Sequence, residues 1–172
     1  MSRISAETLV RAIQKVSAMN LAQKETLAEE IYHQQPILLS SVLVLQRKNV
    51  TMQKLDFLFD MLFICFQAMK DSKLTWPMIS EEEYERQLAR HVAIVKFADA
   101  QSPAHGDQLR QEYAQQHPEQ YLLAYVMTET GKWLQRVTPE ESDTQVMLAA
   151  ICFVNCIAHV PMGLDKVKGR IH

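Results

Sequence analysis

Apolar residues recur every three or four positions along most of the chain, and no stretch sustains an alternation of apolar and polar residues. The first spacing places apolar side chains on one face of an α-helix, whereas alternation is typical of a half-buried β-strand. Leu9, Ile13 and Val16 form one such face near the start of the chain. The sequence therefore predicts an all-α fold.

Capping residues and prolines divide this pattern into eight predicted helices. Ser, Thr and Asn side chains cap helix N-termini, proline suits a first helical turn, and glycine or asparagine suits a stop. Ser80 followed by three glutamates, and Thr138 followed by Pro139 and two glutamates, have the pattern of capping boxes. The expected helices cover about residues 6–18, 21–35, 36–48, 52–70, 81–100, 108–116, 118–130 and 139–159.

The helices predicted over 52–70 and 139–159 are apolar on nearly all sides. A helix with this composition is buried by several neighbours. We therefore expect these two helices, the fourth and the eighth, at the centre of a compact bundle of about eight helices. A short α-solenoid is the alternative, which fits two units of about 80 residues less well because a solenoid needs several repeats.

The two halves of the chain carry the same helix-starting, helix-ending and capping residues in the same order, which favours an internal duplication. The repeat units would cover about residues 5–70 and 80–160, with five extra residues around Trp133 in the second. Identity between the halves is low, so a chance likeness between helical sequences is the alternative. The repeated marks are Pro36 and Pro118, Asn49 and Gly131, Thr51 and Thr138, and Ile64-Cys65-Phe66 and Ile151-Cys152-Phe153.

Composition favours one ordinary domain over residues 1–172. The chain has 172 residues, of which 48% are hydrophobic and 22% charged, with only four glycines. A chain of this length buries enough surface to fold without a metal or a disulfide. The last residues, 163–172, are expected to form a basic polar tail.

Charge and apolar segments bear on partners and location. The formal net charge of −2 gives no broad basic surface, and the tail adds only Lys166, Lys168 and Arg170, so we expect no nucleic-acid partner. The apolar runs over 55–69 and 146–162 are shorter than about 18 residues and contain polar side chains, so we expect no membrane span. Residues 1–20 lack the apolar core of a signal peptide, and three cysteines do not make a disulfide framework. We therefore expect a cytoplasmic protein.

One group of residues has metal-ligand chemistry. Cys152, Cys156 and His159 share a helix face, and Cys65 stands at the equivalent place in the fourth helix. Three thiolates and an imidazole are a permitted zinc set. Unpaired cysteines among apolar residues more often fill a core, however, so we assign no metal and keep these four as a minor alternative.

No catalytic residue and no cofactor is predicted. Ser40 and Ser41 lie inside a predicted helix, and the four glycines are too scattered for a phosphate-binding loop. Glu30 and His33 match half of a di-iron Glu-x-x-His pattern, but only once in the chain.

By elimination, we expect a non-enzymatic module that binds another protein or its own copy, possible homodimers included. Trp76 and Trp133 fall in predicted connections, where each is either a core lid or a partner-binding anchor, and Leu122 and Tyr125 are further candidates. The alternative is a small-molecule or metal site between the two halves, with an enzyme as one form of it.

Overall fold

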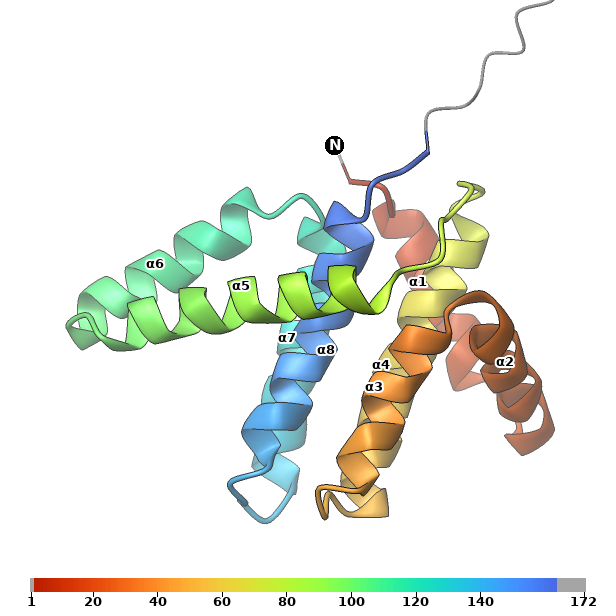
Figure 1. Cartoon of the computed structure of the whole chain (residues 1–172), viewed down its shortest axis with the longest axis horizontal. Coiled ribbons are helices and arrows are strands. Elements are labelled where there is room, and N and C mark those ends of the chain that lie inside the picture. The colour runs from red at the N-terminus through yellow and green to blue at the C-terminus, as the bar shows by residue number, and fades with distance from the viewer. Residues whose placement is uncertain (1, 164–172) are drawn as a thin grey trace, which may run out of the picture.

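Eight α-helices and no strands make up the part of the chain that the computed structural model describes, residues 2–163 (Figure 1). This confirms the predicted all-α class. In chain order the helices are α1 (Ala6–Ser17), α2 (Leu21–Gln34), α3 (Pro36–Gln46), α4 (Met52–Asp71), α5 (Glu81–Asp99), α6 (Pro103–Gln116), α7 (Gln120–Arg136) and α8 (Asp143–His159).

Several helices begin where a side chain caps their free backbone N–H groups. The Ser5 and Ser80 side chains accept hydrogen bonds from the third helical residue of α1 and α5. Asn20 and Gln23 form a reciprocal capping box at the start of α2. Such a cap stabilises a helix by about 1 kcal/mol. These starts are the ones that the sequence predicts.

α4 and α8 form the centre of the bundle, as predicted. Each buries twelve residues, more than any other helix, and the two pack against each other. α1 and α3 pack along α4, while α5 and α7 pack along α8. Each fully buried large apolar side chain, such as Leu62 or Phe153, contributes about 1.5–3 kcal/mol relative to an exposed one.

A buried ion pair joins the N-terminal ends of the two central helices. Lys54 Nζ lies 2.5 Å from Asp143 Oδ1 and 2.6 Å from Glu140 Oε2, and it donates a hydrogen bond to the Thr138 carbonyl at 2.9 Å. Burial acts to lower the pKa of Lys54, but the hydrogen bonds and charges of Asp143 and Glu140 outweigh it and raise the pKa. Burial likewise acts to raise the pKa of Asp143, but Lys54 and a backbone N–H hold it below its usual value. The pair is therefore ionised at neutral pH.

α5 and α6 form an antiparallel arm. In Figure 1 they lie side by side and extend to the left of α7 and α8, away from α3 and α4. The helices approach closely at Gly106, where an added Cβ would come within 2.6 Å of the Ala98 carbonyl oxygen. Only glycine fits this crossing without a backbone shift.

The predicted boundaries of three helices are wrong in the second half of the chain. α6 begins at Pro103, because Ser102 caps it and proline suits its first turn. α7 begins after Pro118 and continues through Gly131 to Arg136. α8 begins at Asp143, so the residues from Thr138 to Glu141 precede the helix instead of forming its capping box.

The internal duplication stays a prediction. The helix pairs α1–α4, α2–α3 and α3–α4 recur as α5–α8, α6–α7 and α7–α8. Two of the repeated marks are not equivalent, however: Asn49 follows α3 in the left-handed conformation with φ of 64°, whereas Gly131 lies within α7. Thr51 is the N-cap residue of α4, whereas Thr138 stands four residues before the N-cap residue of α8.

The basic tail predicted over 163–172 lies, from residue 164 onward, outside the described residues. Among residues 2–163, the helices are each too short or too polar to cross a bilayer.

The Gly106–Ala98 crossing gives a test of the arm. We expect Gly106→Ala to destabilise the protein by about 1–3 kcal/mol, because the added methyl group meets backbone that cannot rotate away. Urea unfolding measures the change in the free energy of unfolding.

Gly131→Ala is the matched control, because a Cβ at that helical position meets no other atom within 4 Å. It should stabilise the protein by about 0.5–1 kcal/mol. Equal effects of the two substitutions would contradict the described crossing.

Candidate functional site

A buried asparagine in α8 ties the arm to the body of the protein. Asn155 is only 4% exposed. Its Oδ1 atom accepts a hydrogen bond from the Tyr113 hydroxyl at 3.1 Å and lies 2.8 Å from His117 Nε2. Tyr113 is in α6, and His117 follows its last turn. The end of α6 is therefore bonded to the centre of the bundle through one amide oxygen.

The hydrogen bonds of His117 determine where its proton lies. Nδ1 accepts a hydrogen bond from the backbone N–H of Glu119 at 3.0 Å, so it carries no hydrogen. Nε2 therefore carries the hydrogen of the neutral ring and donates it to Asn155 Oδ1. A proton added to Nδ1 would face the Glu119 N–H group and break this arrangement.

Glu119 connects the same junction to the N-terminal segment. Its fully buried carboxylate accepts hydrogen bonds from the backbone N–H groups of Arg3 and Ile4. Arg3 Nη1 in turn donates to the carbonyls of Ile157 at 2.9 Å and Val160 at 2.8 Å. Burial raises the pKa of Glu119, although these N–H groups and the Arg3 charge act against it. These hydrogen bonds connect the end of α8 to the N-terminal segment and to Glu119.

Three histidines share this region and favour their neutral forms. Burial lowers the pKa of His91, His117 and His159. The positive charge of Arg90 lowers the pKa of His117 and His159 further. The rings of His117 and His159 have centroids 6.0 Å apart.

An apolar groove of about 840 Å³ lies between the arm and helices α7 and α8. Its volume is within the range of sites that bind ligands. Apolar lining residues come from all four helices, among them Ile94, Phe97, Leu109, Leu123, Met147 and Ile151. The lining contains arginines but no aspartate or glutamate among the described residues.

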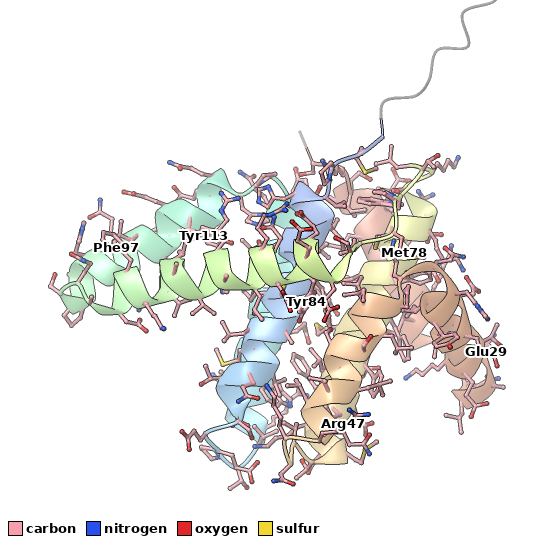
Figure 2. The ribbon with its side chains drawn as sticks, in the orientation of Figure 1. Glu29, Arg47, Met78, Tyr84, Phe97 and Tyr113 are labelled. Carbon is pink, nitrogen blue, oxygen red and sulfur yellow. The ribbon has the colours of Figure 1, made fainter. Side chains whose placement is uncertain are left out.

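The rim of the groove exposes large apolar side chains to solvent. Phe97 on α5 is 61% exposed, and Met127 on α7 is 44% exposed. Figure 2 shows Phe97 near the far end of the arm and Tyr113 closer to α8. Exposed apolar side chains that are contiguous with an apolar groove mark a binding surface.

The structure does not bring the four candidate metal ligands together. Among residues 2–163, the His, Cys, Asp and Glu side chains form no group of three or more that could hold a metal ion. Cys152 lies near the Tyr84 carbonyl oxygen on α5, at 3.6 Å from it. Burial raises the pKa of Cys65 to about 12, and the Cys152 hydrogen bond together with burial raises the pKa of Cys156. Cys65 and Cys156 therefore stay protonated at neutral pH.

The two tryptophans pack against the body of the protein. Trp133 is 4% exposed and stacks on Phe57, with ring centroids 4.8 Å apart. It lies within α7, so its predicted place in a connection is wrong. Trp76 is half-buried between α4 and α5, where its Nε1 donates to the Met69 carbonyl at 2.9 Å. Trp133 therefore acts as a core residue, whereas Trp76 is partly exposed and its role as an anchor stays a prediction. The further candidate Leu122 is fully buried.

The remaining candidate residues do not converge on a site. Glu30 pairs with Lys70 at 2.5 Å, and His33 is exposed. Ser40 and Ser41 donate hydrogen bonds to carbonyls of their own helix.

Comparison of the chain with protein-family models, curated proteins and solved structures finds no match.

Sequence reasoning missed the groove and the Asn155 junction. One signal was present, because Asn155 interrupts a helix that is otherwise apolar on nearly all sides. A buried amide requires hydrogen-bond partners from neighbouring elements. Which residues supply them depends on where α6 lies, and α6 has little hydrophobic patterning of its own.

The neutral state of His117 predicts a pH dependence. Its pKa in the folded protein is below the ordinary value of about 6.5, so the unfolded chain binds the proton more readily. The free energy of unfolding should therefore fall as the pH falls below about 6.5. We expect His117→Gln to make this fall shallower, as measured by urea unfolding between pH 7.5 and 5.

His33→Gln is the control, because His33 is an exposed residue of α2. It should leave the pH profile of the wild type unchanged. A His117→Gln profile as steep as that of the wild type would contradict the assigned proton position.

Proposed function

We propose that the protein is a non-enzymatic binding module, and that its groove between α5, α6, α7 and α8 receives an amphipathic helix of a partner protein. The observation that carries this proposal is the open apolar groove with Phe97 and Met127 exposed on its rim. Leaving such a surface in water is unfavourable, and covering it with an apolar helix face is a common mode of recognition.

The form of the groove supports a helix as its occupant. Its walls are the arm on one side and α7 and α8 on the other, and the surface between them is apolar and open to solvent. The apolar face of an amphipathic helix needs residues at every third or fourth position, which can insert between the side chains of the walls. Because the lining has arginines and no acidic residue among those described, we expect a neutral or acidic partner.

Binding is favoured over catalysis by the state of the reactive groups. A nucleophilic cysteine needs a lowered pKa, whereas burial and hydrogen bonding raise the pKa of Cys65 and Cys156. His117 uses both ring nitrogens in hydrogen bonds, one to Asn155 of α8 and one to the backbone N–H of Glu119 at the start of α7. These groups act in the packing of the protein.

Location and the remaining partner classes belong to the same proposal. The three cysteines are buried and form no disulfide with one another, which supports a reducing compartment such as the cytoplasm. The net charge of −2 argues against nucleic acid as a partner.

This function can be tested by photo-crosslinking in the cells in which the protein naturally occurs. A photoreactive phenylalanine analogue replaces Phe97 in the groove, or Tyr32, an equally exposed aromatic residue on α2. We expect Phe97 to crosslink to one partner segment that mass spectrometry maps to an amphipathic helix, and Tyr32 not to do so. Met127→Glu should abolish the crosslink, because it buries an unpaired charge.

The other outcomes count against the proposal. Equal crosslinks from both positions, or none from Phe97, would show that the groove is not occupied by a partner. A crosslink to a second copy of this chain would replace the partner protein by self-association, and a crosslink to a small molecule would replace it by ligand binding.

A further inference from the structure

The polar residues of the groove are not spread evenly along it. Arg90, His91 and Tyr113 line the part near the Asn155 junction, because Tyr113 hydrogen-bonds to Asn155 and the ring centroids of His91 and Tyr113 are 5.9 Å apart. Phe97 and Arg110 line the part nearer the far end of the arm. We call the part lined by Arg90, His91 and Tyr113 the root of the groove.

Arg90 is the groove-lining cation that has no ion-pair partner among the described residues. Arg110, the other cation of the lining, pairs with Asp99 and with Asp107. Of the acidic residues before Arg90 on α5, Glu82 and Glu83 pair with Arg86, and within residues 2–163 neither Glu81 nor Glu85 forms an ion pair with Arg90. Arg90 is therefore a solvent-exposed cation at the root that is free to pair with an acidic group of an occupant.

His91 supplies a second, independent observation. Its side chain lines the groove although the residue is only 9% exposed. Its Nδ1 atom is buried and has no hydrogen-bond partner within residues 2–163. Gln87 Oε1 and Trp133 Nε1 are buried without partners in the same range as well, but of these three residues only His91 lines the groove. Buried polar groups without partners are uncommon in folded proteins and call for an explanation.

A carboxylate at the root would account for both observations. It would compensate the Arg90 charge, and it would accept a hydrogen bond from the His91 ring after a small rotation of that ring. The acids of the protein itself do not fill this role, since the groove lining contains none among the described residues. The carboxylate must therefore come from the occupant.

We propose that Arg90 and His91 form a carboxylate-binding site at the root of the groove. This inference rests on the proposed function and specifies it further: the partner helix carries an aspartate or glutamate at the end that lies at the root. The rest of its buried face is apolar, to match Leu123, Met147 and Ile151. The site fixes the direction in which the helix lies in the groove, because only the root offers a lining cation without an ion-pair partner among the described residues.

Two small probes of equal chain length separate the contribution of the carboxylate charge to binding from the contribution of the apolar chain. Octanoate carries a carboxylate and 1-octanol does not, and both are titrated at pH 7.5 into protein with 13C-labelled methionine methyl groups. The signals of Met127 and Met147, which line the groove, report occupancy. We expect both probes to shift these signals and octanoate to bind about tenfold more tightly, the difference that one charge-assisted hydrogen bond makes.

Arg90→Gln should remove the advantage of octanoate and leave the affinity for 1-octanol unchanged. Lys96→Gln is the matched control, because Lys96 is an exposed cation on the same helix that does not line the groove. It should keep the advantage. His91→Phe, which retains an aromatic ring and removes its nitrogens, should reduce the advantage in part.

Failure of this inference differs from failure of the proposed function. If both probes bind with equal affinity, or if Lys96→Gln lowers octanoate binding as much as Arg90→Gln, the carboxylate site is wrong while the groove remains a binding surface. If neither probe shifts the Met127 and Met147 signals, the groove does not bind apolar ligands and both proposals fail.

Discussion

The side-chain oxygen of Asn155 is buried near the C-terminal end of the central helix α8, and the position of the arm depends on how that oxygen is satisfied. A buried amide without partners would cost about 1–3 kcal/mol. Tyr113 and His117 supply the two hydrogen bonds, and both belong to the end of α6. Their bonds hold the weakly apolar helix α6 against α8. The Glu119 carboxylate then extends the same network to the first residues of the chain.

Because α6 is held at its end and pairs with α5 along its length, the arm leaves an apolar surface uncovered. The close crossing at Gly106 keeps the two arm helices together, so their apolar side chains face α7 and α8 across a groove instead of filling it. The buried cysteines, by contrast, lie in the well-packed centre where their thiols stay protonated. The reactive groups of the protein are thus used for packing, and its open surface is apolar. This combination favours binding over catalysis.

The sequence predicts the elements that depend on local signals and misses those that depend on tertiary position. Serine and asparagine caps identify the starts of α1, α2 and α5, and unbroken apolar composition identifies α4 and α8 as central. Gly131 misleads as a helix stop because the α7 backbone continues in helical geometry through it. The groove involves residues from four helices, and its existence depends on the angle at which the arm leaves the body, which periodicity does not encode. Arg90 and His91 have no distinguishing local pattern.

The proposed binding requires that the groove is open in the free protein. A soluble gadolinium chelate broadens the NMR signals of methyl groups that it can approach, so 13C-labelled methionines test this requirement in one spectrum. Met127 and Met147 line the groove, whereas Met61 and Met69 lie in the core. We predict strong broadening for the first pair and little for the second. Equal protection of all four methionines would show that the arm closes over α7 and α8, and would contradict the account.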